Sequence, residues 1–232
     1  MRLVSSIKAD IMFQFRHYLY YVYLIVSALY VLLLYFIPSP TKEKMAMFLL
    51  FSDCSFLGAF FIGGIVLLEK DQGIYHHIFV TPVKVAEFIW SKVISLAVIS
   101  LASSFIIFVC SFGFTFKLVY LVIGVTLNSI FASLLGLIFA VRVNSINQYL
   151  LLSPLFVTIF FLPILEVLTI WDSWLLYFIP GKAGLLLMDG VFNPLSFAEW
   201  GYVLAMFAIT IFITYKLAHQ AFYKYIILKI GG

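Results

Sequence analysis

Long apolar stretches separated by short polar segments fill most of the chain after residue 17. A helix needs about 20 apolar residues to cross the roughly 30 Å hydrocarbon core of a bilayer. Six stretches approach or exceed that length, at residues 18–37, 45–68, 89–116, 118–141, 147–165 and 198–217. We therefore predict an all-α polytopic membrane protein with six transmembrane helices, which form one domain over residues 18–232.

Residues 1–17 have the pattern of an amphipathic helix, because Leu3, Ile7, Ile11 and Phe15 share one helical face. Such a helix lies in the membrane interface and leads into the first span. The pattern is equally compatible with a plain anchor and with an element that contacts a partner.

The segment between the fifth and sixth spans has a different pattern. After Pro154, Pro163 and Glu166 come two apolar pieces, separated by Pro180 and Gly181, that are too short to cross a membrane. They predict an external hairpin over residues 171–189 that enters the membrane and returns, broken in the middle. A flat amphipathic loop on the outer surface is the alternative.

Composition supports lipid as the solvent, because 65% of the 232 residues are hydrophobic and only 10% are charged. A soluble domain has about a quarter of its residues charged. The formal net charge of +4 follows the positive-inside rule and gives no reason to expect nucleic acid. Both termini are expected in the cytoplasm. The external lysines are then Lys42, Lys44, Lys117 and Lys182, and the other ten basic residues face the cytoplasm: Arg2, Lys8, Arg16, Lys70, Lys84, Lys92, Arg142, Lys216, Lys224 and Lys229.

A stripe of small residues runs along the fourth span. Its members recur at four-residue intervals, at Gly124, Asn128, Ala132, Gly136 and Ala140. Small side chains let a second helix approach closely. The stripe therefore predicts a packing surface, in which Asn128 either forms a hydrogen bond to the neighbouring helix or lines a pathway.

Two carboxylates are candidates for a substrate pathway. Asp53 lies inside the second span, where an ionisable group is costly and is a functional candidate for that reason. It could contact a cationic group of a substrate, or cap a break in the helix. Glu166 is expected near the external mouth, in contact with water.

The loop between the second and third spans carries the clearest local pattern. Residues 71–80 predict a short cytoplasmic helix whose apolar face is formed by Ile74, Tyr75, Ile78 and Phe79. Thr81 is a suitable N-cap for the next helix, and Pro82 a suitable first residue. Such a loop has the properties of a docking element, although a helix that simply lies on the inner leaflet has the same pattern.

These residues resemble the first cytoplasmic loop of the ABC transporter type-2 permeases. That loop carries Glu, Gly, Thr-Pro and Lys, here Glu69, Gly73, Thr81, Pro82 and Lys92. The resemblance implies an exporter subunit of the bacterial plasma membrane whose coupling helix docks on a separate ATPase. It also implies two ATPase copies, which hold ATP and Mg, and a second permease copy or a paralogue. The chain also resembles the compact members that export drugs or amphipathic peptides, such as the fluoroquinolone and phenol-soluble modulin exporters.

Other chemistry finds little support in the sequence. No glycine-rich phosphate loop is present, so ATP is expected on another chain. His76 and His77 diverge on a helix and have no further ligand at the usual spacing, which disfavours a metal site and favours solvent or ATPase contact. We expect no catalysis and no cofactor in this chain, and Cys54 and Cys110 are expected to be inert thiols. The alternatives are a membrane subunit that binds substrate for a vitamin importer, which would lack the coupling loop, and a membrane enzyme.

Overall fold

The computed structural model describes residues 2–53, 57–75, 84–114, 118–171 and 173–228. All regular secondary structure within these ranges is helical, and they contain no strand. The predicted all-α polytopic fold is therefore confirmed.

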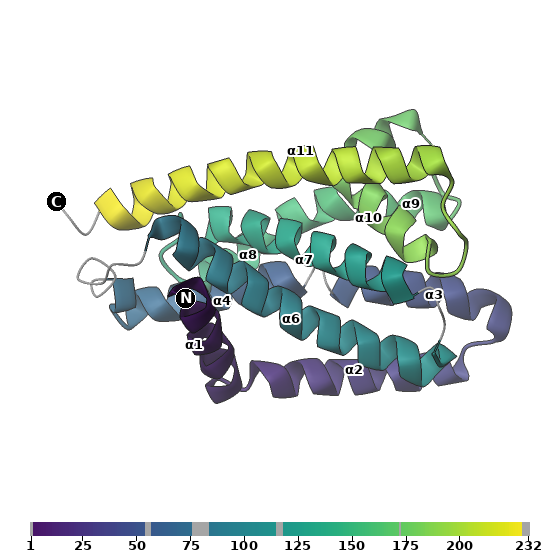
Figure 1. Ribbon diagram of the computed structural model, residues 1–232, viewed down its shortest axis with the longest axis horizontal. Helices are drawn as coiled ribbons and strands as arrows, with labels where there is room; N and C mark the ends of the chain where they lie inside the picture. The colour runs from purple at the N-terminus through teal and green to yellow at the C-terminus, as the bar shows by residue number, and fades with distance from the viewer. Residues whose placement is uncertain (1, 54–56, 76–83, 115–117, 172, 229–232) are drawn as a thin grey trace.

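Four helices are long and apolar enough to cross a membrane. They are α2 (Leu19–Phe36), α6 (Val85–Phe112), α7 (Leu118–Ala140) and α11 (Phe197–Phe222). A π-helical turn, η3 (Tyr223–Ile227), extends α11 toward the C-terminus. Figure 1 shows α2 and α11 along opposite edges of the molecule, with α6 and α7 between them.

The second predicted span, residues 45–68, contains the end of α3 (Ser39–Ser52) and most of α4 (Gly58–Asp71). Residues 54–56 between these two helices lie outside the described residues, so the continuity of this span stays a prediction. Asp53 lies at the end of α3, fully buried, and accepts a hydrogen bond of 2.8 Å from Ser103 Oγ of α6.

The fifth predicted span corresponds to α8 (Ile146–Phe161), a shorter apolar helix. Pro154 lies within this helix, whereas Pro163 follows its end and directly precedes a single turn, α9 (Ile164–Val167). Helix α8 therefore accommodates Pro154 and ends just before Pro163.

The predicted hairpin contains a short 3-10 helix, η2 (Trp174–Phe178), and α10 (Pro180–Asp189). Helix α10 packs against α3, α7, α8 and α11, and most of its residues are buried. Gly181 lies so close to α8 that a Cβ atom there would be 1.9 Å from the carbonyl oxygen of Phe160. This packing favours an inserted hairpin over a flat surface loop.

The small-residue stripe of α7 is a packing surface, as predicted. A Cβ atom on Gly136 would be 2.6 Å from the carbonyl oxygen of Ala59 on α4, and one on Gly124 would be 3.0 Å from the Cβ of Leu187 on α10. The predicted hydrogen bond of Asn128 to a neighbouring helix is not made among the described residues. Its Nδ2 instead donates to the carbonyl oxygen of Gly124 in the same helix, at 2.9 Å.

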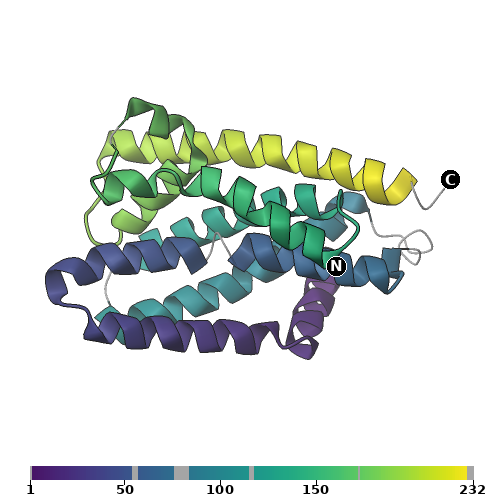
Figure 2. The ribbon, with the colours of Figure 1, turned by 180° about the vertical axis from the view of Figure 1, so that it is seen from behind.

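Helix α1 (Arg2–Arg16) crosses one end of the molecule at a steep angle to α2 (Figure 1). The end of α4 and the last turns of α11 lie at the same end, whereas the start of α3 and helices α9 and α10 lie at the opposite end (Figure 2). The two ends therefore carry different sets of polar residues.

Candidate functional site

At the end of the molecule that holds both termini, Lys92 of α6 bridges two carboxylates from other helices. Its Nζ atom lies 3.0 Å from Asp10 Oδ1 of α1 and 2.5 Å from Glu69 Oε1 of α4. The Lys92 side chain is 1% exposed and that of Glu69 is 6% exposed. Because a buried charge is tolerated only when it is paired and hydrogen-bonded, this triad holds α1, α4 and α6 in one arrangement.

Tyr75 connects the segment after α4 to this triad. Gly73 adopts a left-handed conformation, with φ of 68°, and turns the chain sharply after α4. Tyr75 can therefore fold back, and its hydroxyl donates to the carbonyl oxygen of Val66 at 3.0 Å and to Glu69 Oε2 at 3.3 Å. The requirement for positive φ explains the glycine at position 73.

The ring of Tyr75 lies against two aromatic rings from other helices. Its centroid is 5.8 Å from that of Phe88 on α6 and 5.7 Å from that of Phe222 on α11, both in edge-on geometry. Only 2% of Tyr75 is exposed. The prediction that Tyr75 contributes to an apolar face presented to the cytoplasm is therefore wrong, since its side chain is a contact within this chain.

Burial raises the pKa of Glu69 above its usual value, although the nearby ammonium of Lys92 opposes this shift. Burial also raises the pKa of the Tyr75 phenol well above its usual value, and the Glu69 carboxylate adds to this effect. The phenol therefore stays protonated at neutral pH and acts as a hydrogen-bond donor to Glu69.

The triad is the first of several polar contacts along one face of α6. Ser91 Oγ donates to Asp10 Oδ2 at 2.6 Å, and Ser95 Oγ accepts from Gln14 Nε2 at 2.7 Å. Further along the helix, two serines contact α2: Ser100 Oγ lies 3.2 Å from the Tyr23 hydroxyl, and Ser103 Oγ lies 2.8 Å from Ser27 Oγ. The sequence analysis did not predict this polar face of α6 or the role of Asp10, although the repeated serines within residues 91–104 indicate a polar face.

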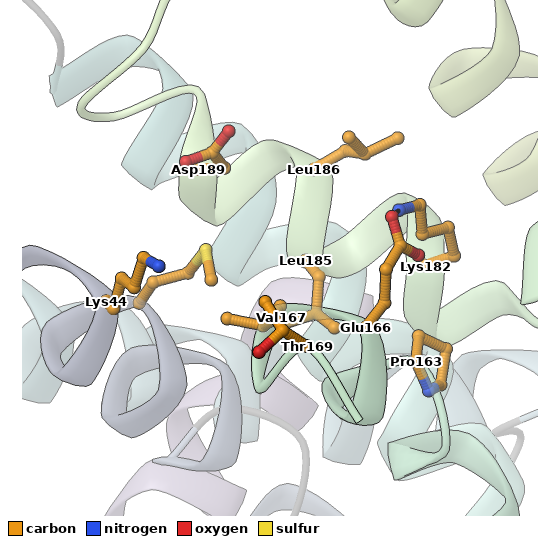
Figure 3. Close-up of a pocket in the computed structure, with 10 residues that line it drawn as sticks. Lys44, Pro163, Glu166, Val167, Thr169, Lys182, Leu185, Leu186 and Asp189 are labelled. Atoms are coloured by element: carbon orange, nitrogen blue, oxygen red, sulfur yellow. Dashed lines mark hydrogen bonds and ion pairs between the residues drawn. The ribbon is translucent and has the colours of Figure 1, made fainter. Parts of the chain in front are cut away.

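The candidates for a substrate pathway do not converge. Asp53 and Asn128 are fully buried, and neither lines the cavity that Glu166 borders. Glu166 instead forms an ion pair with Lys182 at the end of the molecule opposite the triad. That ion pair forms one wall of a cavity of 320 Å³ between α3, α9 and α10 (Figure 3).

Comparison with known proteins gives the family of this chain. A model of the fluoroquinolones export permease protein family matches residues 1–230. The chain belongs to this family. Two proteins named fluoroquinolones export permease protein, from Mycobacterium tuberculosis strains CDC 1551 / Oshkosh and ATCC 25618 / H37Rv, are each 24% identical over 99% of this chain and 98% of their own length.

The resemblance to an ABC type-2 exporter permease is thus confirmed, and the protein is an integral membrane permease. Of the expected coupling residues, the structure brings together Glu69, Tyr75 and Lys92, with Gly73 and Ile74 between the first two. The remaining expected coupling residues lie outside the described residues: His76, His77, Ile78, Phe79, Thr81 and Pro82.

The start of the third span differs from the prediction. Helix α6 begins at Val85, and Lys84 before it is extended, so the helix does not begin at Pro82. The Glu87 carboxylate accepts a hydrogen bond of 2.9 Å from the backbone N–H of Lys84, which stabilises the helix start at this later position.

Within the described part of the permease, no three His, Cys, Asp or Glu side chains gather in a way that could hold a metal ion. Cys110 is a free, exposed thiol on α6, and Cys54 lies outside the described residues. The polar groups of this end connect α1, α4 and α6 to one another.

Proposed function

We propose that this permease is the membrane subunit of an ATP-driven exporter, and that residues 71–80 contain the coupling segment that docks on a separate ABC ATPase. Both termini and this segment face the cytoplasm. One copy forms half of the pathway, and a second copy or a paralogue completes it. ATP and Mg bind to the two ATPase subunits.

The observation that carries this proposal is the connection of Tyr75 to four helices. Its hydroxyl bonds to α4, and its ring contacts Phe88 of α6 and Phe222 of α11. Through Glu69 and Lys92 the same cluster reaches Asp10 of α1. Because packed interiors are close to incompressible, displacement of residues 71–75 by an ATPase would move these helices together.

The substrate we propose is hydrophobic or amphipathic, such as a drug, a peptide toxin or a lipid-like molecule. The names of the two relatives favour a fluoroquinolone among these classes. An apolar cargo also suits a molecule whose helices expose mainly apolar side chains to the surrounding lipid.

Introducing a charge into the predicted docking face tests this function. Phe79→Glu should abolish ATP-dependent uptake of a fluorescent fluoroquinolone into inverted vesicles, because a carboxylate in an apolar interface is desolvated without a partner. The matched control is Phe197→Glu, which places the same change on a side chain that is 98% exposed, in the first turn of α11. It should retain uptake.

Assembly is measured on the same membranes by copurification of the ATPase with the permease. We expect Phe79→Glu to lose the ATPase and Phe197→Glu to keep it. A Phe79→Glu protein that keeps both the ATPase and ATP-dependent uptake would refute coupling through residues 71–80.

A further inference from the structure

The cavity at the end opposite the triad combines charged groups of both signs with an apolar floor. Lys44 enters from α3, Asp189 from the end of α10, and the Glu166–Lys182 pair closes another side, while Val167 and Leu185 lie between them (Figure 3). The cavity measures 320 Å³, which is at the lower end of the size range for small-molecule sites.

Several of these charged atoms have hydrogen-bonding capacity left over. Glu166 Oε2 is buried and has no partner among the described residues, because the contact to Lys182 uses Oε1. Lys44 forms no ion pair or hydrogen bond within the described ranges. Asp189 uses Oδ1 to accept from Asn193 Nδ2 at 3.1 Å, which leaves its second oxygen available.

A second, apolar cavity of 300 Å³ adjoins the first. The two share the side chains of Lys44, Met47, Val167 and Leu185, so they form one continuous depression. The second cavity is otherwise bounded mainly by Met45, Phe48, Ile164 and Leu168. A ligand that fills both needs a polar part that carries charge and an apolar part beside it.

We propose that this outer depression binds a zwitterionic amphiphile. Its anionic group lies at Lys44, its ammonium lies at Asp189, and its apolar body fills the adjoining cavity. The two ammonium groups of Lys44 and Lys182 equal in number the two carboxylates of Glu166 and Asp189, so the cavity lining carries no net charge. A ligand with a single charge would leave either Lys44 or Asp189 without an oppositely charged partner. The inference rests on the proposed export function and adds a site and a ligand class to it.

Two sources supply this chemistry. A fluoroquinolone that carries a basic amine is an aromatic zwitterion at neutral pH, and phosphatidylethanolamine is a zwitterionic lipid with apolar chains. Trp171, an exposed side chain of the kind found at membrane interfaces, follows Thr169 of the depression by two residues, so both molecules could reach the depression from the membrane surface.

The test uses the purified full-length permease in detergent, without ATPase or ATP, and measures binding of three probes by equilibrium dialysis. Norfloxacin carries both charges, its methyl ester only the ammonium, and nalidixic acid only the carboxylate. Lys44→Gln should weaken norfloxacin and nalidixic acid about tenfold and leave the ester unchanged. Asp189→Asn should weaken norfloxacin and the ester about tenfold and leave nalidixic acid unchanged.

Two control variants remove the same charges elsewhere. Lys42→Gln lies on the same helix outside both cavities, and Asp71→Asn lies at the opposite end of the molecule. Neither should change the affinity of any probe. Phe48→Ala, in the apolar cavity, should weaken all three probes by a similar factor, which separates apolar contact from charge recognition.

The lipid source is tested by adding phosphatidylethanolamine or the anionic phosphatidylglycerol to delipidated protein. Competition with norfloxacin by the first lipid alone would support a zwitterion site that also takes lipid, and absence of competition would assign the site to the drug. The proposal is overturned if the wild type binds neither norfloxacin nor phosphatidylethanolamine, or if the two charge variants bind all three probes as the wild type does. Because no ATPase is present, loss of coupling through residues 71–80 would leave this result unchanged.

Discussion

At the scale of single residues, Lys92 is the most consequential side chain at the triad end of the molecule. It is the only cation in contact with Asp10 and Glu69 within the residues that the structure describes. Removing one partner of a buried ion pair leaves an uncompensated charge, which costs far more than the pair contributes when it is complete. The triad therefore favours one arrangement of α1, α4 and α6 strongly over others.

We predict that Lys92→Met destabilises the permease by about 3–5 kcal/mol, because Glu69 and Asp10 are left near each other without a cation. Lys84→Met, an exposed lysine just before the same helix, should change stability by less than about 0.5 kcal/mol. Chemical denaturation in detergent, followed by tryptophan fluorescence, measures both. Equal stability of the two variants would contradict the assigned role of the triad.

The same variant should show a pH dependence of defined sign. Burial already raises the pKa of Glu69, and Lys92 is the main opposing influence, so its removal raises the folded-state pKa further. A carboxyl whose folded pKa lies above its unfolded pKa binds more protons in the folded state, and stability then falls as pH rises between the two values. Lys92→Met should therefore be less destabilised, relative to wild type, at pH 5 than at pH 8. A difference that does not vary with pH would contradict this prediction.

At the scale of elements, the sequence predicted the helical class and the positions of the long apolar helices because hydropathy reports what faces lipid or protein interior. It could not give the contact of Asp53, since the partner of this carboxylate, Ser103, lies on a distant helix. The sequence pattern also placed Tyr75 on an outward face, because the partners of Tyr75 likewise lie on other helices. The turn at Gly73 reverses the chain and brings Tyr75 inward, and a helical projection of residues 71–80 contains no such reversal.

Close packing of α4 on α7 gives a prediction at this scale. A methyl group on Gly136 would meet the backbone of Ala59 at 2.6 Å, whereas one on Gly64 of α4 would meet no atom within 4 Å. Gly136→Ala should therefore destabilise the permease by about 1–3 kcal/mol through forced separation of the helices. Gly64→Ala should be neutral or stabilising by up to about 1 kcal/mol, because alanine favours the helix. Chemical denaturation in detergent compares the two, and a neutral Gly136→Ala would mean that the helices can separate at little cost.

At the scale of the whole molecule, the two ends have distinct chemistry joined by the same helices. One end has the triad, Tyr75 and the last turns of α11, and the other has the Glu166–Lys182 pair and the outer depression. Helix α6 carries the polar contacts that begin at the triad and reach Asp53 at the end of α3. A tilt of α6 at one end would therefore alter its contacts with α2 and α3 further along, as the proposed coupling to an ATPase requires.

The assignment of these ends to the two sides of the membrane is tested by cysteine labelling in intact cells. The excess of basic residues in the segments placed inside predicts that the triad end faces the cytoplasm. In a background where Cys54 and Cys110 are replaced by serine, Asn193→Cys should react with a membrane-impermeant maleimide before lysis, because Asn193 is exposed beside the outer depression. Gln72→Cys, exposed directly after α4, should react only after permeabilisation. The reverse pattern would place residues 71–80 outside the cell, where no ATPase could dock, and the proposed coupling would then be untenable.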